Sequence, residues 1–231
     1  MAERHDFAER TELAKALAAA VALKIAAAIE ATGSAVIAVS GGTTPAKFFA
    51  ALGKHKELDW DKVWVTLVDE RWVDETSARS NALLVNEKML QGPAAVAHFV
   101  PLYTGGEVPD GAAIARAARM QAELPHPFAA VVLGMGNDGH TASFFPGGDA
   151  LTAALTGAGP VLAINAPGAG EPRVTLTLSR LLDTSGLFLH IEGEEKAETL
   201  AKALGEGPVE DMPVRAVLRQ STTPLEIYWA P

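Results

Sequence analysis

The stretch that decides the fold is Ala129–Gly147, which reads AAVVLGMGNDGHTASFFPG. Its first five residues form an uninterrupted apolar run of strand length, as expected for a strand that is buried on both faces of a sheet. The run breaks into a loop that contains Gly134, Gly136 and Gly139 and is followed by His140. Ligands of open α/β sheets bind beyond the carboxyl ends of the strands, where this loop would lie. We therefore expect the active site here.

Apolar strand candidates and helical patterns alternate on both sides of this stretch. The strand candidates are 35–39, 63–68, 99–103, 161–165, 174–178, 187–191 and 225–229. Helical spacing predicts helices at 9–31, up to about 52, 80–90, 111–123 and 194–204, with Gly33 near the C-cap of the first. This alternation is typical of a mostly parallel, Rossmann-like sheet in a three-layer α/β/α fold. We expect residues 1–231 to form a single α/β domain.

Composition narrows the classes of function. The chain has 231 residues and no cysteine, which excludes disulfides, thiolate metal sites and a cysteine nucleophile and fits a reducing compartment. A formal charge of −9 argues against nucleic acid or an anionic membrane as a partner. The first ten residues are charged and lack a signal-peptide pattern. The alanine-rich run after them carries Lys15 and Lys24, so we expect a soluble helix rather than a membrane span.

The glycines of the central loop have the spacing of a dinucleotide-binding turn, Gly-x-Gly-x-x-Gly. That motif also needs an acidic residue about 20 positions later, at the end of the next strand. Residues 154–163 contain none. The loop carries Asp138 and His140 instead, where a nucleotide-binding turn is small or apolar. The sequence therefore favours a carboxylate–imidazole pair over a nucleotide site.

Two other loops have the composition of anion sites. Ser40–Pro45, SGGTTP, lies between a predicted strand and helix, so its N–H groups and hydroxyls can face an anion. It lacks the lysine of a nucleoside-triphosphate loop, and taken alone it is better explained as a tight β–α turn. Asp69–Trp72, DERW, puts three charges directly after an apolar strand, which is costly unless they are paired or belong to a site.

The motifs form one set, in chain order: Ser40–Pro45, Asp69–Trp72, Arg79–Asn81, Gly134–Ser143 and Pro146-Gly147. In this set the sequence resembles the 6-phosphogluconolactonase family, and the motifs nearly span the chain. The resemblance implies a cytoplasmic esterase of the pentose phosphate pathway that hydrolyses 6-phosphoglucono-1,5-lactone to 6-phosphogluconate. It also implies the fold of the glucosamine-6-phosphate deaminases and no metal or organic cofactor. We expect a monomer or a small homo-oligomer.

Residue by residue, the resemblance makes His140 the general base and Asp138 its acidic partner. It assigns the 6-phosphate and the sugar to the loop that begins at Ser40 and to Arg71, and it places Arg173 near the phosphate. The full set of expected substrate-binding residues is Ser40, Gly41, Gly42, Thr43, Asp69, Arg71, Gly136, Asn137 and Arg173.

The chemistry of lactone hydrolysis supports the same residues. The reaction needs a base for water and hydrogen-bond donors for the developing oxyanion. Histidine suits the first role, and the N–H groups of residues 134–139 suit the second. No Gly-x-Ser-x-Gly motif supports an acyl-enzyme.

Two alternatives remain open, a deaminase and a non-catalytic phosphosugar-binding module. The deaminase pattern has Asn-Glu where this chain has Phe144-Phe145, and tyrosine in place of Arg71, although Asp69 is retained.

Overall fold

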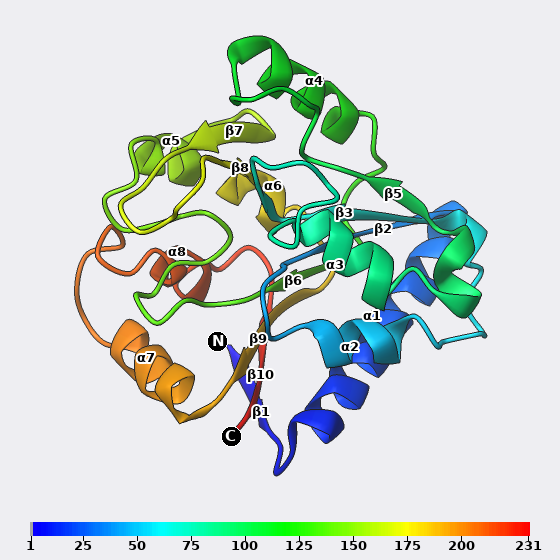
Figure 1. Cartoon of the computed structure of the whole chain (residues 1–231). Coiled ribbons are helices and arrows are strands. Elements are labelled where there is room, and N and C mark those ends of the chain that lie inside the picture. Colours follow the sequence, from blue (N-terminus) through cyan, green and yellow to red (C-terminus); the bar gives the residue numbers. More distant parts are fainter. Residues whose placement is uncertain (1) are drawn as a thin grey trace.

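A central parallel sheet organises the chain, whose computed structural model describes residues 2–231 (Figure 1). The strand order is β1-β10-β9-β6-β2-β3-β5, and every neighbouring pair is parallel. The seven strands are β1 (Glu3–Asp6), β2 (Ala35–Val39), β3 (Val63–Leu67), β5 (His98–Val100), β6 (Ala130–Leu133), β9 (Leu187–Glu192) and β10 (Leu225–Ala230). The mostly parallel α/β fold predicted from the sequence is confirmed.

The strand that begins the deciding stretch lies in the middle of this sheet. All of β6 is buried, and it pairs with β2 on one side and β9 on the other. Both faces of β2 and β6 are covered, and their side chains are apolar throughout. Burial of each large apolar side chain stabilises the fold by about 1.5–3 kcal/mol.

Helices cover the two faces of the sheet. The helices are α1 (Arg10–Thr32), α2 (Ala46–Leu52), α3 (Asn81–Lys88), α4 (Gly111–Ala122), α5 (Leu151–Thr156), α6 (Leu178–Leu182), α7 (Glu194–Leu204) and α8 (Val214–Leu218), with short 3₁₀ turns η1 (Trp60–Lys62) and η2 (Gly92–Val96). Helices α1, α2 and α3 pack in sequence on one side, and α7 packs with α8 on the other (Figure 1). Gly33 ends α1 in the left-handed conformation, as its C-cap position predicts.

The strand order reverses between β2 and β6. After β2 the chain proceeds to β3 and β5, whereas after β6 it proceeds in the opposite direction to β9 and β10. Crevices for ligands form at such a switch point, beyond the carboxyl ends of the strands. The loops that follow β2 and β6 are the glycine loops singled out above. The topology thus brings them side by side.

Part of the sequence prediction is corrected. The strand candidates 161–165 and 174–178 do not join the parallel sheet. They form β7 (Val161–Ile164) and β8 (Arg173–Leu176), which pair antiparallel with each other, and β8 pairs antiparallel with β4 (Asp69–Arg71). The pattern of a short apolar run does not tell which strand it will pair with, because pairing is decided by distant residues.

Besides β4 and the two 3₁₀ turns, four short elements were not predicted. Strand β1 is a charged edge strand, Glu-Arg-His-Asp, with no apolar alternation. Helices α5, α6 and α8 have five or six residues each, too short for helical periodicity to show. Within residues 2–231 no helix combines the length and apolar character needed to cross a bilayer.

Candidate active site

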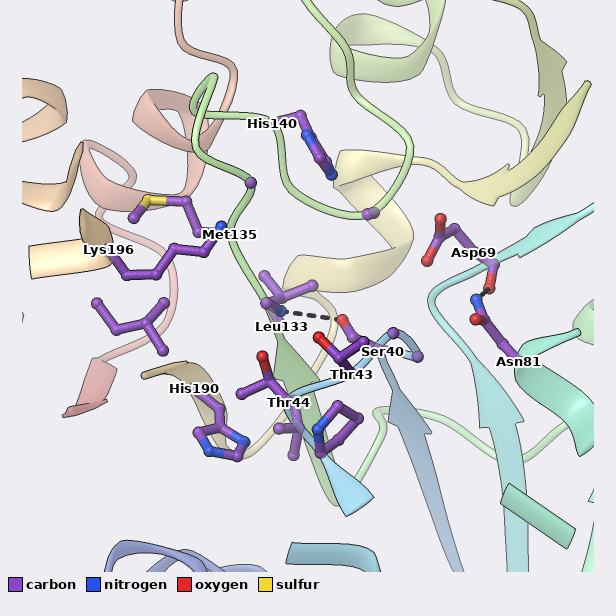
Figure 2. A pocket seen from close by; sticks show the side chains of 18 of the residues that line it. Ser40, Thr43, Thr44, Asp69, Asn81, Leu133, Met135, His140, His190 and Lys196 are labelled. Carbon is purple, nitrogen blue, oxygen red and sulfur yellow. Dashed lines mark hydrogen bonds between the residues drawn. The ribbon is translucent and has the colours of Figure 1, made fainter. Parts of the chain in front are cut away.

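A cavity of about 350 Å³ opens where β2, β6 and β9 end, and β4 closes one side of it. Figure 2 shows Lys196 and Met135 on one side of the cavity and Asp69 and Asn81 on the other. Ser40, Thr43 and Thr44 lie between these groups, and His140 lies across from them (Figure 2). The predicted site residues that line the cavity are Ser40, Gly41, Gly42, Thr43, Asp69, Arg71, Gly136, His140 and Arg173.

The loop after β6 is folded on itself by its own backbone. The N–H of Gly136 donates to the carbonyl of His140 at 2.8 Å, and the N–H of Gly139 donates to the carbonyl of Gly136 at 3.1 Å. A Cβ on Gly136 would lie 2.1 Å from Nδ1 of His140, so no other residue fits there without moving the imidazole. Gly139 has φ +80°, which glycine adopts freely. The glycines therefore shape the loop around the histidine.

Asp138 contacts both the imidazole ring and the backbone of His140. Its Oδ1 lies 2.6 Å from Nδ1 of His140 and accepts the backbone N–H of the same residue at 3.0 Å. Burial raises the pKa of the Asp138 carboxyl, but the hydrogen bonds from the His140 ring and backbone outweigh this effect and lower that pKa to about 2. An ionised carboxylate can only accept, so Nδ1 is the donor of this bond, and in a neutral imidazole Nε2 then has the free lone pair. Asp138 itself does not line the cavity.

The charged residues that follow β3 have two different roles: some line the cavity and one anchors helix α3. Asp69 is buried at the cavity wall, where its Oδ2 accepts the hydroxyl of Ser143 at 2.6 Å. Glu70 instead accepts the backbone N–H groups of Arg71, Asn81 and Ala82, each at 2.8 Å, at the start of α3. Burial raises the pKa of Glu70, and these three hydrogen bonds oppose the rise. Glu70 therefore anchors α3, while its neighbours face the cavity.

Two arginines meet on the small antiparallel sheet. Arg71 and Arg173 are directly opposite each other in the β4–β8 register, and both line the cavity. The Nε atom of each is buried without a hydrogen-bond partner among residues 2–231. Nη1 of Arg173 lies 3.8 Å from Oδ2 of Asp69, and burial lowers the pKa of the Arg173 guanidinium. Like charges opposite each other destabilise a strand pair, so this pair is suited to an anion.

The loop after β2 leaves its donors free. The N–H groups from Gly41 to Thr44 make no hydrogen bond in the described chain. Gly42 has φ +90°, and a Cβ on Gly41 would lie 1.9 Å from Oδ1 of Asn81. Ser40 accepts the N–H of Gly134 at 3.0 Å and so ties this loop to the loop after β6. Free N–H groups on consecutive residues form a cradle for an anion.

Asn137 is the other predicted residue that the structure does not bring to the cavity. Its amide donates to Oε2 of Glu195 on α7 at 2.9 Å. Conversely, Lys196 and His190 line the cavity but were not predicted, and Asn81, which ends the Arg79–Asn81 motif, lines it without having been given a role. Burial lowers the pKa of Lys196, the third cation there. The sequence feature that could have predicted Lys196 is its position in the first turn of a helix that follows a central strand.

Among residues 2–231, no three His, Cys, Asp or Glu side chains are grouped so that they could hold a metal ion.

Fold and cavity define the class: an α/β protein with a doubly wound parallel sheet and a ligand site at its switch point. The model of the family "Glucosamine-6-phosphate isomerases/6-phosphogluconolactonase" matches residues 8–229, and the chain belongs to this family. It is 52% identical to the 6-phosphogluconolactonase of Rhizobium meliloti (strain 1021), with 100% of this chain and 99% of that protein covered. It is 42% identical to the one of Pseudomonas putida, over 98% and 92%.

Solved structures agree. A crystal structure of a 6-phosphogluconolactonase from Shewanella baltica OS155 is similar with a TM-score of 0.97 and 38% identity, covering 100% of this chain and 98% of that one. A monomeric glucosamine-6-phosphate deaminase has a TM-score of 0.78 at 18% identity, over 97% and 96% of the two chains, which is a likeness of fold alone. The family resemblance read from the motifs is confirmed.

Proposed function

We propose that this chain hydrolyses 6-phosphoglucono-1,5-lactone to 6-phosphogluconate in the pentose phosphate pathway, with water activated by His140. The observation that carries the proposal is the contact of His140 Nδ1 with Asp138 at 2.6 Å, which leaves Nε2 of a cavity-lining imidazole free to accept a proton. The names of the full-length relatives supply the substrate.

One histidine, His140, accounts for both proton transfers of the proposed reaction. His140 Nε2 takes a proton from water as the water oxygen attacks the lactone carbonyl carbon, and the carbonyl becomes an oxyanion. When the tetrahedral intermediate collapses, the bond to the ring oxygen breaks and that oxygen takes the proton from the imidazolium. Ionised Asp138 stabilises the imidazolium in between. General-base catalysis of this kind contributes about 10²–10⁴-fold.

The free donors of the β2–α2 loop support a place for the 6-phosphate. The N–H groups from Gly41 to Thr44 face no protein acceptor in residues 2–231, and a phosphate supplies several strong acceptor oxygens. Arg71 from β4 and Lys196 from α7 line the same cavity and add positive charge. Charge-assisted hydrogen bonds are about twice as strong as neutral ones, so these cations favour the phosphorylated lactone.

Phe145 argues for lactone hydrolysis over sugar deamination. Its ring centroid lies 4.2 Å from that of His140, and the side chain lines the cavity. A phenyl ring can neither take nor give a proton, so the histidine has no acidic partner on this side. The loss of an acid–base partner costs on the order of 10²-fold or more.

The test is a pair of assays on the purified protein. Hydrolysis of the 1,5-lactone, corrected for its spontaneous opening, should be rapid and saturable. Incubation with glucosamine 6-phosphate should release ammonia at background only. Ammonia release at a turnover comparable with lactone hydrolysis, or lactone opening no faster than without protein, would overturn the proposal.

A further inference from the structure

The glycine N–H groups of the β6 loop are already engaged. Gly134 donates to Oγ of Ser40 at 3.0 Å, Gly136 to the carbonyl of His140 at 2.8 Å, and Gly139 to the carbonyl of Gly136 at 3.1 Å. The sequence had pointed to residues 134–139 as donors for the oxyanion, and for these three glycines that prediction is wrong. The donor for the carbonyl oxygen is therefore an N–H group that these three hydrogen bonds do not use.

Ala142 has an unusual backbone. Its φ is +47°, and among residues 2–231 no other residue except glycine has a positive φ. It occupies the second position of a tight turn that is closed by the N–H of Phe144 donating to the carbonyl of Thr141 at 2.9 Å. A positive φ at this position normally requires glycine. An alanine there costs roughly 1–2 kcal/mol, which the fold tolerates.

The neighbours of Ala142 are held firmly enough to impose this conformation. The hydroxyl of Thr141 donates to the carbonyl of Gly134 at 2.7 Å. On the other side, the hydroxyl of Ser143 donates to buried Asp69 at 2.6 Å. Strained residues persist where the surrounding structure over-determines them, and they cluster at functional sites.

The N–H of Ala142 has no acceptor within residues 2–231. Ala142 is 8% exposed and lines the cavity, two residues after His140. Buried N–H groups without a partner are rare, because each costs free energy comparable to a lost hydrogen bond. A group that is unpaired, fixed by strain and placed beside the base is preorganised for a charge that arises only during the reaction.

We propose that the backbone N–H of Ala142 donates to the oxyanion that forms from the lactone carbonyl. The proposal rests on the hydrolysis proposed above, and it assigns a catalytic role to the backbone of a residue whose side chain is a methyl group. The free N–H groups of the loop after β2 are left for the phosphate. The N–H of Ala142 takes no proton and gives none, so the proton inventory on His140 is unchanged.

The decisive experiment replaces the amide by an ester, Ala142→lactic acid, which removes this N–H and keeps the methyl group. Loss of one oxyanion donor should lower kcat about 10²–10³-fold while KM for the phosphorylated lactone changes by no more than a few fold. A matched control is Ala158→lactic acid, in the exposed loop between α5 and β7, which should leave both constants unchanged.

A second control addresses the turn. The ester at 142 also weakens the Thr141 carbonyl that accepts from Phe144, so Phe144→phenyllactic acid removes that hydrogen bond and keeps the Ala142 N–H. It should cost at least tenfold less in kcat than Ala142→lactic acid, with both folded by circular dichroism. Equal losses, or an Ala142 ester within about threefold of wild type, would overturn this inference. Wild-type protein that fails to open the lactone would instead overturn the proposed function.

Discussion

Two glycine loops follow neighbouring strands of the sheet, yet they use their backbone N–H groups in opposite ways. The loop after β6 spends those of Gly134, Gly136 and Gly139 on hydrogen bonds within the protein. In the loop after β2, the N–H groups of Gly41 to Thr44 make no hydrogen bond within residues 2–231, and these four residues line the cavity. The first loop therefore fixes the position of a side chain, whereas the second has the unpaired donors that the proposed phosphate site requires. Glycine content alone does not distinguish the two loops. They differ in whether their N–H groups are hydrogen-bonded within the protein.

The largest expected effect removes the side chain that the β6 loop holds. His140→Ala should lower kcat by roughly 10²–10⁴-fold and keep KM within a few fold, since the imidazole acts on water and not on binding. His126→Ala, a side chain on the surface beyond the cavity, is the matched control and should leave both constants unchanged. His140→Asn with activity within a few fold of wild type would remove His140 from the role of base.

A direct comparison of the loops comes next. In Gly136→Ala the new methyl group collides with the His140 ring at 2.1 Å, so kcat should fall about 10²-fold for phosphorylated and unphosphorylated gluconolactone alike. In Gly41→Ala the collision is with Asn81 and displaces the loop after β2, which we propose binds the phosphate. KM should therefore rise for the phosphorylated lactone alone. Steady-state kinetics on both substrates measures the difference. Identical changes in kcat and KM for the two variants would contradict the separate roles of the two loops.

A smaller effect is expected from Arg71, a cation that lines the same cavity as the loop after β2. Arg71→Ala should raise KM for the phosphorylated lactone about tenfold and largely erase the preference over unphosphorylated gluconolactone, as one charge-assisted contact is lost. Arg116→Ala, an exposed arginine on α4 away from the cavity, should preserve that preference. If the preference survives in both Arg71→Ala and Gly41→Ala, the phosphate binds elsewhere.

The smallest effect concerns stability in acid. Folding lowers the pKa of Asp138 from 3.8 to about 2, so its ionised form favours the folded protein above pH 3.8, and this contribution is lost as the pH falls through about 2. Wild type should therefore melt above Asp138→Asn at pH 5, and the difference in Tm should shrink between pH 4 and pH 2. A difference that stays constant over this range would show that the carboxylate is not linked to folding.

The sequence was sufficient for the β–loop–α pattern, and the structure shows why. Each apolar run, such as 130–133, is followed directly by its loop, so order along the chain also places the loop at the end of the strand. The parallel sheet then gathers these ends at one edge. Most of the candidate site could thus be predicted from Ser40–Pro45, Asp69–Trp72 and Gly134–Ser143, because each motif is local.

Asn137 and Lys196 mark the limit of that reasoning. Asn137 lies within the Gly134–Ser143 motif, but its amide donates to Glu195, which is 58 residues later in the chain. Lys196 sits in an ordinary helical pattern, yet α7 begins beside the cavity because β9 lies next to β6. The direction of one side chain and the neighbour of one strand are set by contacts that no local pattern contains.

By itself the sequence determined the fold class and the family, and it placed Asp138 and His140 on one loop, since all of these follow from short, contiguous runs. The structure added the contact between the two side chains. Tertiary structure alone decided that Arg71 and Arg173 face each other, because the antiparallel pairing of β4 with β8 joins segments about a hundred residues apart. It also decided the positive φ of Ala142. An alanine has no local preference for that conformation. It is held there by the bond from Thr141 to Gly134 on the same loop and by the bond from Ser143 to Asp69, 74 residues away in the chain.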